Sequence, residues 1–100
     1  MNATDPNFGF ALPPFNAADA LVSLKRQLRD LKLAERGAAF ELRGKRVVEL
    51  ALEDHSIQLK LARRPMLTPE SDVRVLTSAA EVRKALDEIK KRLARWEQEE

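Results

Sequence analysis

The sequence predicts a single α+β domain in which a helix, a three-stranded antiparallel meander and a second helix follow one another. Apolar residues repeat every three or four positions near both ends of the chain, as on the buried stripe of a helix. Between residues 40 and 61 they alternate with polar residues, as in strands that are buried on one face only. Because the sheet then offers one apolar face, we expect both helices to cover that face.

Asn16 is the predicted N-cap of the first helix, and Asp19 places a negative charge in its first turn, where the helix dipole favours one. We expect this helix to run from about 17 to 34, to within about 2–4 residues at each boundary, and Gly37, which tolerates a left-handed C-cap, is the expected stop signal. Its buried stripe consists of leucines, namely Leu21, Leu24, Leu28 and Leu31.

Three strands follow from the period-two pattern. The residues expected on their buried face are Phe40, Leu42, Val48, Leu50, Leu52, Ile57, Leu59 and Leu61. Short turns at residues 43–45 and 54–56 make neighbouring strands antiparallel, and Gly44 suits the first of them. Residues 63–77 form a longer connection, in which Val73 and Val75 are candidates for a short fourth strand.

Ser78 and Glu81 have the spacing of a capping box and mark the start of the second helix. Its buried stripe is expected to contain Val82, Leu86, Ile89, Leu93 and Trp96. The free energy gained by burying these stripes is smaller than the conformational entropy lost when the chain is ordered. We therefore expect a monomer of marginal stability or a homodimer.

Composition excludes several classes of protein. The chain has 18 basic and 16 acidic residues, so its formal charge is only +2, and its 44% apolar content is that of a globular domain. No apolar run reaches the ~18–20 residues of a membrane span, and the first residues do not resemble a secretory signal. We therefore expect a cytoplasmic protein without membrane contact. The absence of cysteine excludes disulfides and thiolate chemistry.

Catalytic equipment is sparse. His55 is the only histidine and lies between Asp54 and Ser56 in a predicted turn, where consecutive residues cannot aim at one another as a catalytic triad does. The spacing of a metal site and the glycines of a phosphate-binding loop are also missing. We expect no enzymatic activity, no metal and no cofactor. An enzyme that uses His55 is the remaining alternative, and full activity after His55→Ala would exclude it.

Residues 1–15 read as an irregular arm preceding a domain at 16–100, because Pro13 and Pro14 prevent a helix there. The arm is unusually apolar for a free tail, and its candidate contact residues are Phe8, Phe10, Leu12 and Phe15. These side chains either cover their own core or dock on another protein or a second copy.

Basic residues form two predicted clusters. The first would be a stripe on the first helix, made of Lys25, Arg29, Lys32 and Arg36. The second would gather at one end of the sheet and contain Arg43, Lys45, Arg46, Arg63 and Arg64. Such cations either keep the surface soluble or contact nucleic-acid phosphates.

The order of helix, three strands and helix is similar to that of double-stranded-RNA-binding domains. The resemblance implies a cluster of lysines at the start of the last helix, where they would face phosphates. This chain has Ser78-Ala79-Ala80-Glu81 there, so the similarity is one of topology. We predict a small protein–protein interaction module that self-associates. The alternative is a nucleic-acid-binding domain that uses the basic clusters.

Overall fold

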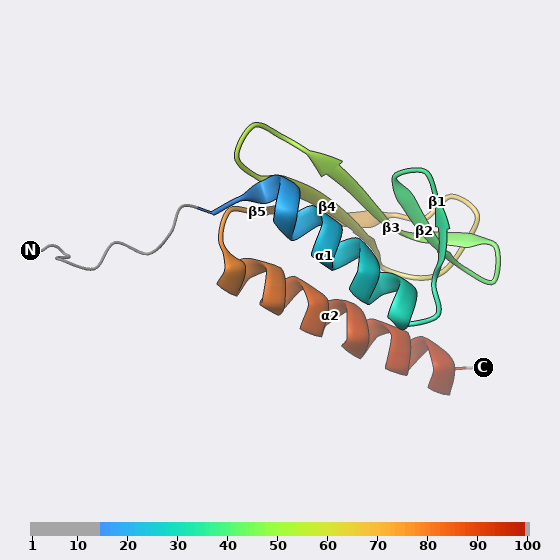
Figure 1. The fold of residues 1–100 in the computed structure, drawn as a ribbon. Helices are drawn as coiled ribbons and strands as arrows, with labels where there is room; N and C mark the ends of the chain where they lie inside the picture. The colour runs from blue at the N-terminus through green and yellow to red at the C-terminus, as the bar shows by residue number, and fades with distance from the viewer. Residues whose placement is uncertain (1–14, 100) are drawn as a thin grey trace, which may run out of the picture.

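Two helices and five strands make up the computed structural model, which describes residues 15–99. In chain order they are α1 (Ala17–Asp30), β1 (Ala34–Arg36), β2 (Ala39–Leu42), β3 (Lys45–Leu52), β4 (Ile57–Ala62), β5 (Ser71–Leu76) and α2 (Ala79–Gln98) (Figure 1). The strands form one sheet in this same order, and every neighbouring pair is antiparallel. The α+β class is confirmed, with five strands in place of the three or four expected.

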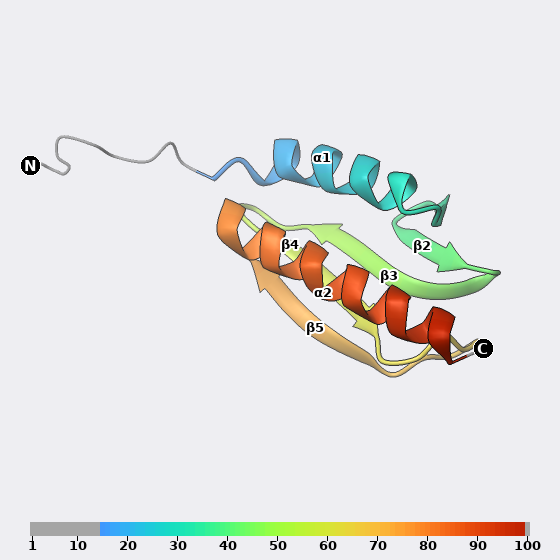
Figure 2. The ribbon, with the colours of Figure 1, turned by 90° about the horizontal axis from the view of Figure 1, so that it is seen from below.

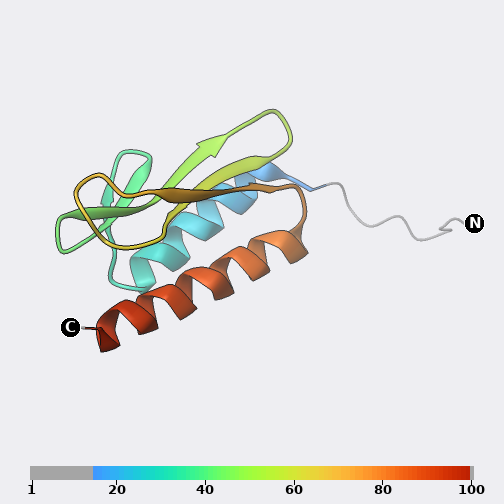
Figure 3. The same cartoon turned by 180° about the vertical axis from the view of Figure 1, so that it is seen from behind.

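Both helices lie on one face of the sheet and run in the same direction (Figures 1 and 2). α1 contacts β3 and α2, and α2 contacts β5 at the far side of the sheet. Seen from behind, the opposite face of the sheet has no described element over it (Figure 3). The domain therefore has two layers, and its core lies between the helices and what we call the inner face of the sheet.

The predicted stripes account for most of this core. Leu24, Leu28, Ile89 and Trp96 are buried on the two helices, while Leu21, Leu31, Val82 and Leu93 pack against the core with part of their surface exposed. In the strands, Phe40 is the largest side chain that is fully buried. Leu52 is the exception: it is 50% exposed, because it lies at the end of β3 next to the turn into β4.

The prediction that Gly37 stops the first helix is wrong. α1 ends at Asp30, with Leu31 as its C-cap, and Lys32 adopts the left-handed region with φ of 71°. This reversal turns Leu33 into the core, where it is 4% exposed, and leads the chain into β1. Lysine is not a residue that marks such a turn, so the pattern contains no stop signal before Gly37.

Gly37 lies instead in the two-residue turn between β1 and β2, with φ of 61°. The turn between β2 and β3 is also short, and both of its residues have positive φ: 54° at Arg43 and 80° at Gly44. This is the backbone of a type I′ turn, whose twist suits a hairpin.

A β-bulge explains one core residue that alternation missed. The register between β2 and β3 shifts between Phe40 and Glu41, so that Phe40 pairs with Val48 and Glu41 pairs with Arg46. Val47 is the extra residue in β3, and both valines are 1% exposed. A bulge lets two consecutive residues reach the same core, which strict alternation forbids.

The predicted N-cap of α2 is confirmed. Ser78 Oγ accepts a hydrogen bond from the Glu81 N–H at 3.2 Å. Glu81 does not return to Ser78: its Oε1 accepts from the Thr77 N–H at 2.6 Å and from Thr77 Oγ1 at 2.7 Å. The hydrogen bond from the Thr77 hydroxyl, and to a lesser extent the one from its N–H, hold the pKa of Glu81 below its usual range.

Loss of this cap should be measurable. Ser78→Ala is expected to lower the free energy of unfolding by about 1 kcal/mol, because the Glu81 N–H loses its acceptor. Urea titration measures the difference, and Ser78→Asp, which keeps an acceptor, should stay close to the original chain. Equal losses in the two variants would contradict the capping role.

Candidate protein interaction site

The basic stripe expected on the first helix is not formed. Only Lys25 and Arg29 belong to α1, because Lys32 lies in the reversed turn and Arg36 lies in β1. Arg29 Nη1 is 2.6 Å from Glu35 Oε1, and Arg36 Nε is 3.5 Å from Glu41 Oε1. Two of these cations are therefore already paired with carboxylates.

The second basic cluster does gather at one end of the sheet. Antiparallel pairing places the start of β3, with Lys45 and Arg46, beside the end of β4, which Arg63 and Arg64 follow. Arg43 is in the adjoining turn between β2 and β3.

Two arginines of this cluster are also paired. Arg46 Nη1 is 3.0 Å from Glu49 Oε2, and Arg63 Nε is 3.0 Å from Asp72 Oδ1. Each pair reduces the positive potential that this end of the sheet presents to a phosphate.

Arg92 joins α2 to the sheet. Its Nη2 lies 2.7 Å from both Asp72 Oδ2 in β5 and Glu88 Oε2 in α2, and its Nη1 donates to the Ala62 carbonyl at 3.1 Å. The side chain is only 13% exposed. Hydrogen bonds from Arg92 and then Arg63 hold the pKa of Asp72 below its usual range. This network fixes α2 across the last two strands.

His55 is exposed in the turn between β3 and β4, as the sequence predicts. It borders an open hollow together with Asp54, Leu52 and Phe15. Phe15 packs against the core of its own chain, so this residue of the arm lies in cis. Phe8, Phe10 and Leu12 are outside the described residues.

Within residues 15–99, no group of three or more His, Asp or Glu side chains is placed to hold a metal ion. Neither helix of this region has the length and apolar character to cross a bilayer.

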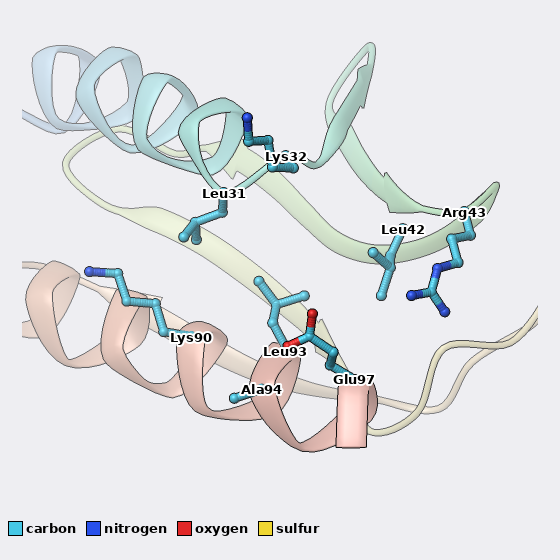
Figure 4. A pocket seen from close by; sticks show the side chains of 8 residues that line it. All are labelled: Leu31, Lys32, Leu42, Arg43, Lys90, Leu93, Ala94 and Glu97. Atoms are coloured by element: carbon cyan, nitrogen blue, oxygen red, sulfur yellow. The ribbon is translucent and has the colours of Figure 1, made fainter. Parts of the chain in front are cut away.

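A groove opens at the end of the domain where both helices terminate. Leu31, Leu42 and Leu93 point into it from the C-cap of α1, from β2 and from α2, and its volume is about 360 Å³ (Figure 4). Lys32 and Lys90 stand at its rim, and Arg43 and Glu97 complete the lining. The groove combines an apolar floor with charges of both signs, so its chemistry does not select one class of ligand.

The β5 edge, defined as the side of Ser71–Leu76 that faces away from β4, is the most distinctive surface of the sheet. The Arg63 N–H donates to the Glu70 carbonyl at 2.8 Å, and these two residues are opposite in the continued register of β4 and β5. Hydrogen-bonded and non-hydrogen-bonded pairs alternate along an antiparallel ladder. Asp72, Arg74 and Leu76 therefore bond to β4, whereas the main-chain groups of Ser71, Val73 and Val75 point outward.

Side chains at this edge are unusually apolar for a solvated strand. Val73 and Val75 are 50% and 56% exposed on the outer face, where Lys60 and Gln58 are their neighbours in β4. The opposite edge of the sheet is different, because β1 has only three residues and two of them are Glu35 and Arg36. Short, charged edge strands resist further pairing, and β5 is neither short nor fully charged.

On its inner side, the β5 edge borders a hollow, and the Arg74 side chain covers one of its outward main-chain groups. A hollow of about 330 Å³ lies between parts of β5 and α2, and its lining includes Arg74, Val75, Leu76, Lys84 and Glu88. Arg74 Nη1 donates to the outward carbonyl of Val73 at 3.2 Å, and its Nη2 is 3.3 Å from Glu88 Oε2. An added strand would have room for its side chains in this hollow. Its N–H groups would replace the exposed Arg74 guanidinium as the donor to the Val73 carbonyl.

Sequence reasoning identified Val73 and Val75 as strand residues but not as a site. The signal was present, because two valines alternate with Asp72 and Arg74, the reverse of the usual order of apolar inside and polar outside. Only the pairing order shows that this strand is at the edge. No family model, curated protein or solved structure matches the chain, so its function must be argued from this site.

Proposed function

We propose that this chain is a non-enzymatic protein–protein interaction module that binds an extended segment of its partner along the β5 edge. The observation that carries the proposal is the row of outward main-chain groups at Ser71, Val73 and Val75 on a strand with no second neighbour in the described sheet. Strand addition satisfies such groups and provides affinity through the main chain.

The exposed valines support the same conclusion. Val73 and Val75 lie on the outer face, where alternate side chains of an added strand would pack beside them. Burial of this apolar surface adds to the main-chain bonds, and the hollow beside α2 accommodates side chains on the inner face. The arm, through Phe8, Phe10 and Leu12, is proposed as a further contact with the partner.

The alternative of nucleic-acid binding has less support. Affinity for nucleic acid comes from lysines and arginines that neutralise its phosphates and so release the counterions bound to it. A cation that is already paired with a carboxylate contributes less to this effect. Arg29, Arg36, Arg46 and Arg63 are each within 4.0 Å of a carboxylate, which leaves mainly Lys25, Lys32, Lys45 and Arg64. If this chain binds neither duplex RNA nor duplex DNA at low ionic strength, this alternative is excluded.

Selection of a random peptide library on the full chain tests the proposed edge. We expect the selected peptides to shift the amide resonances of Ser71, Val73 and Val75. We also expect them to bind a Val73→Pro variant at least about tenfold more weakly, a difference of about 1.4 kcal/mol. Proline removes an N–H that points away from β4, so the native ladder keeps its bonds.

Val73→Thr is the matched control, since it keeps both the N–H and a β-branched side chain. It should bind the peptides as the original chain does. Peptides that bind all three chains equally, or that shift resonances away from β5, would show that the edge is not the site.

A further inference from the structure

We infer that the segment accepted by the β5 edge is β5 of a second copy, paired antiparallel with Val73 opposite Val73 across a twofold axis. The inference rests on the proposed function, because it uses the same edge, and it adds the identity and register of the partner strand. It follows from two properties of β5: the alternation of its main-chain groups and the order of its charges.

The alternation limits the register. Ser71, Val73 and Val75 have their N–H and carbonyl groups on the free side, so only these residues can form the hydrogen-bonded pairs of a new ladder. A twofold pairing that uses at least two of these residues in each strand leaves three central arrangements. The residue facing its own copy is Asp72, Val73 or Arg74.

The charges distinguish among these arrangements. With Asp72 or Arg74 at the centre, two like charges lie directly opposite each other at the close spacing of a non-hydrogen-bonded pair, which is destabilising. With Val73 at the centre, Asp72 lies opposite Arg74 of the second copy, and Arg74 lies opposite Asp72 of the second copy. Each strand is therefore complementary in charge to itself in this register alone.

The groups involved can make these contacts. Asp72 uses Oδ1 for Arg63 and Oδ2 for Arg92, and a carboxylate has about four acceptor positions, so it can accept a third donor. The Arg74 side chain is 45% exposed and holds the Val73 carbonyl, which in the paired state would accept from the Val73 N–H of the second copy. The displaced guanidinium then lies beside Asp72 of the other chain.

The resulting assembly is a continuous sheet with the helices of both copies on the same side. On its outer face, the valines at position 73 meet at the axis, and Val75 lies opposite Ser71 of the second copy. Such a contact is isologous and closes after two copies, because each β5 edge is used once. The opposite edge of the sheet is β1, a short strand whose charged Glu35 and Arg36 oppose further pairing.

Single cysteines test the register, because the chain has none of its own. In the inferred pairing, the Cα atoms of the two residues at position 73 are about 5.5 Å apart, within the ~4.4–6.8 Å that a disulfide spans. The two residues at position 75 are four residues out of register, or roughly 13 Å apart. In a glutathione buffer, Val73→Cys should therefore form at least about tenfold more disulfide dimer than Val75→Cys.

The two positions form a matched pair, since their exposed fractions are 50% and 56% and random collision should oxidise them equally. A mixture of Ser71→Cys and Val75→Cys should form the mixed dimer, and the preference should disappear in urea. Equal cross-linking at positions 73 and 75, or mixed dimers of Val73→Cys with Val75→Cys, would overturn the inferred register.

Sedimentation of the unmodified chain separates this inference from the proposed function. We expect its average mass to rise toward that of a dimer with concentration, and Val73→Pro to remain monomeric. A monomer at every concentration that still binds selected peptides at β5 would overturn self-pairing and leave the proposed function intact. Failure of the peptides as well would overturn both.

Discussion

Replacing Phe40 with alanine is expected to lower the free energy of unfolding by about 3–5 kcal/mol. Phe40 has no exposed surface, and in β2 it pairs with Glu35 on one side and Val48 on the other. Its ring belongs to the core that the sheet shares with both helices. Alanine leaves a cavity that rigid neighbours fill only in part, so lost contacts add to the lost hydrophobic transfer energy.

Leu52→Ala is the control for this prediction. The same alternating pattern assigns both residues to the core, but Leu52 is 50% exposed, and we expect it to cost about 1 kcal/mol or less. Urea titrations with a common slope provide the comparison. If Phe40→Ala leaves too little folded protein, Phe40→Leu should still be more damaging than Leu52→Ala, and the opposite order would contradict the arrangement of the core.

Replacing Arg92 with methionine is expected to cost about 1.5–3 kcal/mol at neutral pH, in the range of hydrogen bonds to charged groups. Methionine retains apolar bulk but cannot bridge Asp72, Glu88 and the Ala62 carbonyl. The two carboxylates now share one guanidinium nitrogen, each at 2.7 Å, so its removal leaves two negative charges close together. The network between α2 and β5 is therefore weakened, although Arg63 still faces Asp72 and Arg74 still joins Glu88 to β5.

The pH dependence of stability gives this prediction a second readout. The pKa of Asp72 is lowered in the folded chain, so its stabilising effect is present above the usual pKa of an aspartate. That effect disappears as the pH falls through the lowered value. Arg92→Met removes the largest cause of the shift, so the difference in stability between this variant and the original chain should shrink in acid.

Arg95→Met is the control on the same helix. Arg95 is exposed, and its replacement should change stability by no more than about 0.5 kcal/mol at any pH. Urea titrations of the three chains between neutral and acidic pH make the comparison. A loss for Arg92→Met that is constant with pH would show that packing, and not the carboxylate network, is responsible.

The buried stripes were predictable because they depend on local periodicity. A helix repeats near every 3.6 residues and a strand every 2, so the spacing of Leu24, Leu28, Leu50 and Leu59 is enough to assign them to the core, where all four are buried. The Ser78 cap was predictable for the same reason, since it involves residues only three apart.

The failures arise where the backbone departs from those periods. β1 contains Ala34, Glu35 and Arg36, which is too short and too polar to show alternation. Lys32 turns the chain with a positive φ that lysine seldom adopts, and this divides the expected basic stripe between a helix, a turn and a strand. Val47 reaches the core only because a bulge adds a residue to β3.

The sequence alone determined the α+β class, the order of helix, antiparallel strands and helix, and most of the core, because these follow from interactions between residues near one another in the chain. Tertiary structure decided which strand lies at the edge of the sheet, which arginines meet carboxylates, and where Arg92 crosses from α2 to β5. These depend on contacts between distant segments, whose partners no periodicity specifies. The candidate site at Ser71, Val73 and Val75 belongs to this second group, since a strand becomes an edge only through its place among the others.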